Sequence, residues 1–152
     1  MKMTLLTAIF SLLASVSFAN PVFDKEVVIS VEELPVEAQK FLRDNFSNEK
    51  ILSVVCESDI TEKDYYVYYD GGMKVKFDRK GNWESVENEM SCVPDSVVPA
   101  NILSMIRAKH PEKKVTSISR DTRGDDKGYE VELDRILDMQ FDLNGRFMRY
   151  DD

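Results

Sequence analysis

Residues that carry chemistry are scarce in this sequence of 152 residues, which has one histidine and two cysteines. A histidine-dependent triad would have to use His110, and a zinc site would need more histidine or cysteine ligands at suitable spacing. The sequence also has no glycine-rich phosphate loop, dinucleotide fingerprint or nucleophile elbow. We therefore predict a protein that is not an enzyme and that has no cofactor and no metal.

Acidic residues gather in two segments, 121–128 and 142–145, that contain the residue types of calcium loops. Neither segment has the ligand register of an EF-hand, which ends in a bidentate glutamate. We predict that both segments are solvated turns, and that His110 has a half-buried capping role at the end of a helix.

Long apolar runs are absent after the first residues. Lys2 precedes an apolar stretch from Leu5 to Val16, and Ser17-Phe18-Ala19 has small residues at the positions that signal peptidase reads. The stretch is too short to span a bilayer comfortably. We predict a cleaved signal peptide at 1–19, in preference to a buried first helix. The mature domain, 20–152, is then periplasmic or secreted, with no membrane insertion.

Basic residues are outnumbered, with 20 Lys and Arg against 28 Asp and Glu and a formal net charge of −8 at pH 7. An acidic surface repels nucleic acid and anionic membranes, so neither is an expected partner. Hydrophobic residues make up 43% of the chain, which argues against disorder and is enough for one domain with its own core.

The two cysteines, Cys56 and Cys92, would meet an oxidising compartment after export. They allow only one intrachain disulfide, and the spacing matches neither a CxxC redox pair nor a metal site. Sequence does not show whether their Cα atoms approach each other, so a Cys56–Cys92 disulfide and two free thiols remain alternatives.

The chain carries an internal repeat, in which Leu34-Pro35 of the first copy corresponds to Val98-Pro99 of the second. The aligned positions continue without a gap to Trp83 and Phe147. Apolar positions and turn glycines stay in phase, including Gly81 with Gly145. We predict two copies, at about 30–88 and 94–152, that build a single domain.

Each copy begins with a helix that starts near Pro35 or Pro99, and the second helix ends at His110-Pro111. Alternating apolar residues and tight-turn sequences predict four strands after each helix. The expected strands are 50–57, 64–70, 72–78 and 82–87, then 114–121, 128–134, 136–142 and 146–150. The predicted fold is α+β, a tandem α-β-β-β-β repeat forming an antiparallel sheet with helices packed on one face and the other face open.

The segment 65–69 contains four tyrosines, more than one buried strand face requires. In the second copy, Tyr129, Val131 and Leu133 alternate with two glutamates, so the apolar set should face the helices. The alignment of the copies then places Tyr65, Val67 and Tyr69 in the core. The side chains expected on the open face are Tyr66, Tyr68, Lys74 and Lys76 in the first copy and Glu130, Glu132, Asp138 and Gln140 in the second. Trp83 is expected in the core, unless a bulge turns it outward.

The motifs "LPVEAQKFL" and "YYVYYDGGMKVKFDRKGNW", with "VPANILSMI", "KHPEKKVTSI" and "YEVELDRILDMQFDLNGRF", resemble those of the periplasmic PepSY-like family. Its fold is similar to that of the beta-lactamase inhibitor protein. The resemblance implies a tandem α/β repeat whose sheet leaves a curved face open. It also implies, by shape alone, an inhibitory or regulatory role, because fold does not settle function.

These observations predict a non-catalytic exported binding module. We expect it to recognise a protein or peptide in the periplasm through the open sheet face, with Tyr66 and Tyr68 as anchors and Lys74 and Lys76 as rim charges. One alternative is that these side chains are ordinary strand residues. Another is a small-ligand or envelope-stress protein with an apolar pocket between sheet and helices, and a third is an enzyme dependent on His110.

Overall fold

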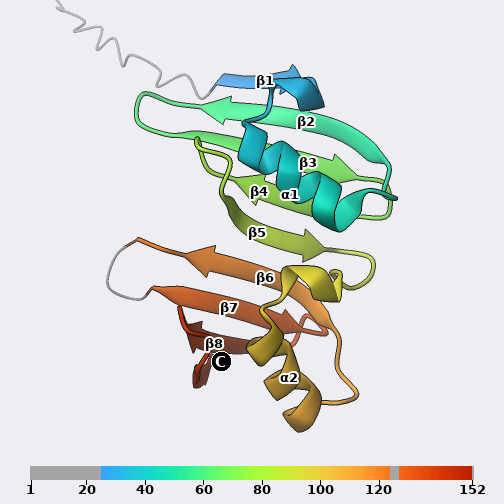
Figure 1. Ribbon diagram of the computed structural model, residues 1–152, viewed down its shortest axis with the longest axis vertical. Coiled ribbons are helices and arrows are strands. Elements are labelled where there is room, and N and C mark those ends of the chain that lie inside the picture. Colours follow the sequence, from blue (N-terminus) through green and yellow to red (C-terminus); the bar gives the residue numbers. More distant parts are fainter. Residues whose placement is uncertain (1–24, 124–126, 152) are drawn as a thin grey trace, which may run out of the picture.

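Nine strands form one antiparallel sheet in which the order along the chain is also the order across the sheet. The computed structural model describes residues 25–123 and 127–151, and the predicted signal peptide 1–19 lies outside them. The strands are β1 (Lys25–Ile29), β2 (Ile51–Ser58), β3 (Lys63–Tyr69), β4 (Met73–Phe77), β5 (Trp83–Asn88), β6 (Val115–Asp121), β7 (Gly128–Leu133), β8 (Leu137–Asp142) and β9 (Phe147–Asp151) (Figure 1). The prediction of an α+β protein with an open antiparallel sheet is confirmed.

Eight of these strands lie where the sequence pattern predicts them, within about one residue at most ends. The strand β1 was not predicted. Four of its five side chains are exposed, so it lacks the alternation of apolar and polar residues that marks a half-buried strand. It pairs with β2 at one edge of the sheet.

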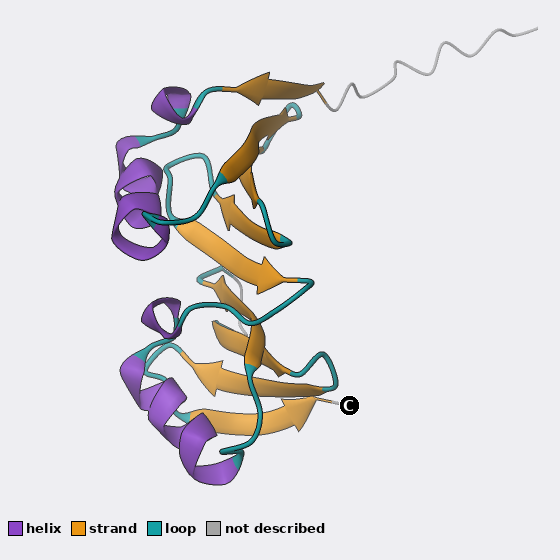
Figure 2. Ribbon diagram, turned by 90° about the vertical axis from the view of Figure 1, so that its right-hand side faces the viewer, coloured by secondary structure: helices purple, strands orange, loops and turns teal. Residues whose placement is uncertain are grey.

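Two α-helices, α1 (Val36–Phe46) and α2 (Ala100–Lys109), lie on the same side of the sheet (Figure 2). Each follows a short 3₁₀ helix, η1 (Val31–Glu33) or η2 (Asp95–Val97). The prolines stand one position before the helices, at the N-caps, where neither cap residue makes a side-chain hydrogen bond. No helix of the described residues is long and apolar enough to cross a membrane.

Aromatic rings connect α1 to the sheet. The Phe41 ring meets Phe77 edge-on at a centroid distance of 5.8 Å, and the Phe46 ring lies 5.4 Å from that of Tyr69. At α2, the side-chain amide of Asn101 donates a 2.7 Å hydrogen bond to the carbonyl of Asn144 in the β8–β9 turn. Buried side chains from both helices and from the strands form one hydrophobic cluster.

Backbone hydrogen bonds recur at positions that the sequence alignment of the two copies makes equivalent. The amide of Asp70 donates to the carbonyl of Lys50 at 2.8 Å, and Asp134 donates to Lys114 at 2.9 Å. In the β4–β5 and β8–β9 turns, Gly81 donates to Asp78 and Gly145 to Asp142, both at 2.9 Å. The two halves of the chain meet where β5 pairs with β6, with Val86 opposite Ile118.

Trp83 stays on the helix side of the sheet in spite of a bulge. Lys76 pairs with Ser85 and Phe77 pairs with Trp83, which leaves Glu84 as the extra residue. The indole is half-buried and packs against the core, as predicted from its alignment with Phe147.

The Cys56–Cys92 disulfide is absent, and both cysteines are free thiols. Cys56 lies on β2, whereas Cys92 follows β5, so β3 and β4 separate the two strands. Neighbouring strands are about 4.8 Å apart, and bridged cysteines need Cα atoms within about 7 Å. Of the two alternatives that the sequence left open, the structure has the two free thiols.

Candidate functional site

The side of the sheet opposite α1 and α2 is covered by no helix of the described residues, and we call it the open face (Figure 2). The strand pairings arrange its side chains in two rows that run across both halves. One row contains Val55, Tyr66, Lys76, Ser85, Ser119, Glu130, Gln140 and Arg149. The other contains Ser53, Tyr68, Lys74, Glu87, Ser117, Glu132, Asp138 and Asp151.

The predicted facing of the tyrosines is confirmed. Tyr65, Val67 and Tyr69 retain 5%, 0% and 3% of their exposure and belong to the core. Tyr66 and Tyr68 are half-buried and occupy the alternate positions of β3. Strict alternation therefore supplies two aromatic side chains to the open face.

Lysines from the neighbouring strand stand beside these rings. Lys76 lies directly opposite Tyr66, and Lys74 lies opposite Tyr68. The ammonium groups of Lys74 and Lys76 lie 5.7 and 5.8 Å from the centroid of the Tyr66 ring, within the range of cation–π attraction. The four predicted residues therefore form one contiguous patch, which we call the tyrosine–lysine patch.

Carboxylates neutralise both lysines of this patch. Lys74 Nζ lies 2.6 Å from Glu87 Oε1, and Lys76 Nζ lies 2.9 Å from Asp64 Oδ2 and 3.0 Å from Glu84 Oε2. The hydrogen bond to Glu87 raises the pKa of Lys74. Burial by itself would lower the pKa of Lys76, but its two carboxylate partners outweigh that effect and raise it. The lysines stay charged, but they are compensated from within the protein and do not form a free cationic rim.

The second half of the open face is acidic. Glu130, Glu132, Asp138 and Asp151 occur on three neighbouring strands. The Gln140 side-chain amide donates to Glu130 at 2.7 Å and to Asp151 at 2.9 Å. Burial, followed by the charges of Glu130, Glu132 and Asp151, raises the pKa of Asp138. Arg149 Nε lies 2.9 Å from Asp151 Oδ1 and lowers the pKa of Asp151. This group, the acidic patch, therefore has one of its carboxylates paired, while like charges remain around Asp138.

Sequence reasoning identified the open-face side chains of β3, β4, β7 and β8 but missed charged residues that contact them, which are Asp64, Glu84, Glu87, Arg149 and Asp151. Asp64 follows from the same alternation as Tyr66 and was overlooked. Glu84 and Asp151 depend on bulges, because β5 and β9 each shift register once against β4 and β8. No local pattern in the sequence indicates these shifts.

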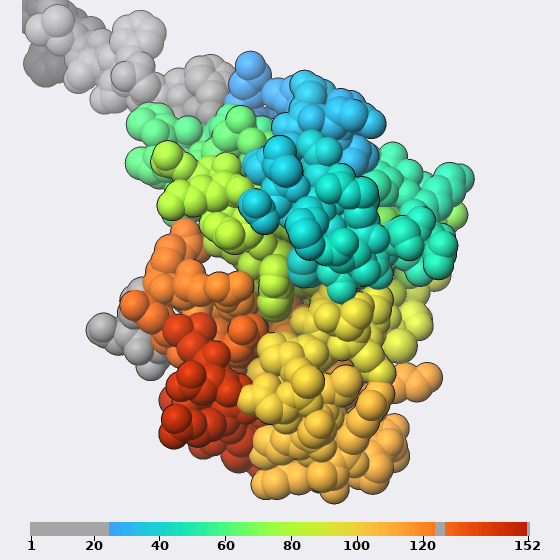
Figure 3. All heavy atoms as spheres, in the orientation of Figure 1, coloured from blue at the N-terminus to red at the C-terminus, as the bar shows by residue number. Residues whose placement is uncertain are grey.

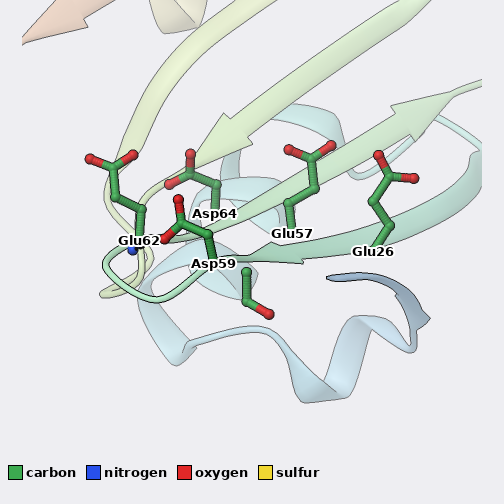
Figure 4. Close-up of a pocket in the computed structure, with 6 residues that line it drawn as sticks. Glu26, Glu57, Asp59, Glu62 and Asp64 are labelled. Atoms are coloured by element: carbon green, nitrogen blue, oxygen red, sulfur yellow. Dashed lines mark hydrogen bonds between the residues drawn. The ribbon is translucent and has the colours of Figure 1, made fainter. Parts of the chain in front are cut away.

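An acid-lined hollow at the β2–β3 turn was also not predicted. It is lined by five carboxylates, from Glu26, Glu57, Asp59, Glu62 and Asp64 (Figure 4). Asp59 accepts hydrogen bonds from the backbone amides of Thr61 and Glu62, both at 2.6 Å, and Asp64 pairs with a lysine. Within residues 25–123 and 127–151, no group of three or more His, Cys, Asp or Glu side chains is placed to hold a metal ion.

The remaining chemical candidates have structural contacts. Asp142 Oδ1 accepts from the amides of Asn144 and Arg146, so 142–145 is a turn as predicted. In the other acidic segment, residues 124–126 lie outside the described residues. His110 is the C-cap of α2, and its Nε2 lies 3.1 Å from the hydroxyl of Tyr150.

Comparison with known proteins matches this architecture. A family model described as "Putative beta-lactamase-inhibitor-like, PepSY-like" matches residues 63–149. No protein of curated function matches the chain.

Three crystal structures from Bacteroides resemble the chain. One, a "putative calcium-regulated periplasmic protein" from Bacteroides thetaiotaomicron, has 35% identity and a TM-score of 0.77, covering 84% of this chain and 97% of that one. A putative periplasmic protein of the DUF2874 family from Bacteroides vulgatus has 32% identity and a TM-score of 0.75, covering 85% and 98%. Another from the same organism, described as of unknown function, has 29% identity and a TM-score of 0.74, covering 84% and 100%. The predicted periplasmic or secreted location is confirmed by these descriptions.

Proposed function

The chain belongs to the PepSY-like family, described as beta-lactamase-inhibitor-like, and we propose that it is a non-catalytic periplasmic module that binds a protein or peptide through the open face of its sheet. The observation that carries this proposal is the continuous open face itself. It crosses both halves of the chain, and no helix of the described residues lies over it (Figure 2). Half-buried tyrosines are typical anchors in protein interfaces.

The two halves of the open face favour a partner with two kinds of surface. Around Tyr66 and Tyr68, the lysines are already neutralised, so an apolar or aromatic segment fits best there. Burial, and after it the neighbouring acids, raise the pKa of Asp138. A basic segment over the acidic patch would offset the repulsion from those acids. We propose that the repeats 30–88 and 94–152 are copies of one unit in which most helix-facing residues stayed apolar while the open faces diverged.

The family description and the shape of the sheet support an inhibitory or regulatory role of this binding, by analogy only. One similar structure is described as calcium-regulated. We therefore propose to measure binding both with calcium and with a chelator, because a divalent cation would compete with a basic partner for the acidic patch.

The test is capture of periplasmic proteins by the mature chain and by a Tyr66→Glu/Tyr68→Glu variant. Val36→Glu serves as the control, since it adds a carboxylate at an exposed apolar position on α1, on the other side of the sheet. Each captured protein is then purified and titrated against all three chains by calorimetry. The proposal expects a partner that binds the mature chain and the control equally and the double variant at least about tenfold more weakly.

If all three folded chains bind a partner equally, the open face is not its binding site and the proposal is wrong. Neutralising the acidic patch with Glu130→Gln/Glu132→Gln gives a second test. This change should weaken a basic partner and reduce the dependence of its affinity on salt.

A second candidate is the binding of a small apolar ligand beside α1. A hollow there is lined by Leu42, Phe46, Ile51 and Tyr69, and the Tyr69 hydroxyl is buried without a hydrogen-bond partner. Native mass spectrometry of the purified protein tests this candidate. A bound molecule that is lost in the Tyr69→Phe variant would favour it over the open face.

A further inference from the structure

A groove lies on the helix side of the sheet, where the two halves of the chain meet. Its walls are the side chains of Phe41 on α1, Trp83 on β5, Leu103 on α2 and Tyr129 on β7, with Val97 from η2. The helix side is hollowed between the blue-green first half and the yellow-to-red second half (Figure 3). Trp83 stacks on Phe41 at a centroid distance of 5.8 Å and lies 6.4 Å from Tyr129. The groove therefore has aromatic walls contributed by both halves.

Arg120 on β6 places a cation in this groove. The groove has two adjoining hollows, and Arg120 lines both of them together with Phe41 and Trp83. Arg120 pairs with Tyr129, and it shares the helix side with the fully buried Ile118. Its Nε is buried and has no hydrogen-bond partner. Across the described residues, we find no side-chain hydrogen bond or ion pair for this guanidinium.

The fold does not require a cation at this position. The equivalent position in the first half is Cys56, which is buried and apolar in character and pairs with Tyr65 as Arg120 pairs with Tyr129. A guanidinium has five donors and loses solvation when it is buried without partners. Local violations of folding rules of this kind are expected at functional sites.

Two of the three carboxylates around the groove have other partners. Asp95 pairs with Arg107, and Asp44 pairs with Lys40. Glu37, the remaining acid of the lining, lies on the first turn of α1. The uncapped N-terminus of α2 also lines the groove, at Pro99 and Ala100, and adds the positive end of a helix dipole. Arg120 and this helix end are thus the groups of the groove that can bind an anion.

We propose that this groove binds the free C-terminal carboxylate of a peptide that ends in an aromatic or aliphatic residue. Arg120 holds the planar carboxylate through paired N–H donors, the geometry for which a guanidinium is suited. The last side chain of the peptide packs on Trp83 and Leu103. The site lies on the other side of the sheet from the open face and does not depend on it.

The shape of the groove favours a peptide over a fatty acid. A long alkyl chain needs an enclosed apolar channel, whereas the groove is open along its length and has Asp95 and Ser96 among its lining residues. The side chains beneath it, including Phe77, Ile102 and Ile118, are fully buried in the core. A short peptide can place one apolar side chain on the aromatic wall and leave its backbone in water.

Trp83 provides the readout, because it is the only tryptophan of the sequence and lies in the groove. The mature chain is titrated with the tripeptide Ala-Ala-Phe, with the same peptide carrying a C-terminal amide, and with decanoate, into the millimolar range. The expected result is a saturable change in Trp83 emission for the free acid. The amide should bind at least about thirtyfold more weakly, because it lacks the negative charge and the second acceptor oxygen that pair with the guanidinium.

Two variants locate the site. Arg120→Met should reduce affinity for the free acid by about thirtyfold or more, whereas Arg43→Met, which removes an exposed arginine of α1 outside the groove, should not change it. Circular dichroism and urea unfolding establish that both variants are folded. No saturable signal with the free acid, equal affinity for acid and amide, or unchanged binding by a folded Arg120→Met variant would overturn the proposal. Binding of decanoate without binding of the tripeptide would overturn the peptide as occupant.

Discussion

Arg120 occupies on β6 the position that Cys56 occupies on β2 in the first half of the chain, and both side chains lie on the helix side of the sheet. Cys56 is buried among apolar neighbours, whereas Arg120 has a buried Nε without a hydrogen-bond partner. The same fold therefore accommodates an apolar side chain in one half and a cation in the other.

This relationship predicts opposite effects for two substitutions. Arg120→Met should keep or raise the free energy of unfolding, because it removes an unsatisfied buried donor. Cys56→Arg should lower it by more than about 2 kcal/mol, because it buries a charge that has no partner. Urea unfolding followed by circular dichroism measures both. A loss of more than about 1 kcal/mol in Arg120→Met would mean that the guanidinium stabilises the fold.

Phe77 and Phe141 should be equivalent core residues, since they retain 0% and 1% of their exposure. Replacing either with alanine should lower the free energy of unfolding by about 3–5 kcal/mol, because each change removes a large buried ring and leaves a cavity. Tyr66→Ala on the open face should cost far less. Similar losses for Tyr66→Ala and Phe77→Ala in urea melts would contradict the assigned facing of β3 and β4.

Gly81, in the β4–β5 turn, packs against the start of α1. Its φ is +86°, and an added Cβ would lie 2.7 Å from Pro35 Cβ and 2.9 Å from the Ala38 nitrogen. Gly71 has a similar φ of +91°, but a Cβ there meets nothing within 4 Å. Gly71→Ala should therefore cost only the backbone strain, about 1–2 kcal/mol, and Gly81→Ala should cost clearly more. Equal changes in thermal unfolding would show that the turn can move away from the helix.

Asp138 should lower the stability of the fold at neutral pH and cease to do so at acidic pH, whereas a salt-bridged carboxylate stabilises the fold at neutral pH. Its pKa is raised in the folded protein, first by burial and then by neighbouring acids, so its charged form costs stability above the folded pKa. That cost disappears as the pH falls below the ordinary carboxylate value of about 4. Asp138→Asn should therefore raise the free energy of unfolding at neutral pH by no more than about 0.5 kcal/mol, because water screens the charges.

Urea melts across the acidic pH range measure this effect, with Glu112→Gln as a control that removes one negative charge from an exposed loop residue. The advantage of Asp138→Asn over the natural chain should shrink as the pH is lowered. If Glu112→Gln shows the same gain in free energy of unfolding, or if the gain of Asp138→Asn stays constant with pH, the gain comes from net charge and not from the acidic patch.

The facing of most strand side chains could be predicted from the sequence, whereas an exposed edge strand and contacts between distant strands could not. Alternation of side chains along β3, β4, β7 and β8 was enough to place Tyr66 and Lys76 on one face and Val67 and Phe77 on the other. The short β1 could not be predicted, because its side chains are nearly all exposed. The separation of Cys56 from Cys92 became clear only from the strand order.

The sequence by itself determined the class of fold, the positions of the strands after each helix and the face that most of their side chains take. These properties follow from a local period of two residues, which any short segment contains. Tertiary structure alone decided which groups meet, including the pairing of Lys76 with Glu84 across a bulge and the unpaired Arg120 among aromatic rings. Such contacts depend on register and on the packing of distant segments, and neither is contained in a local pattern.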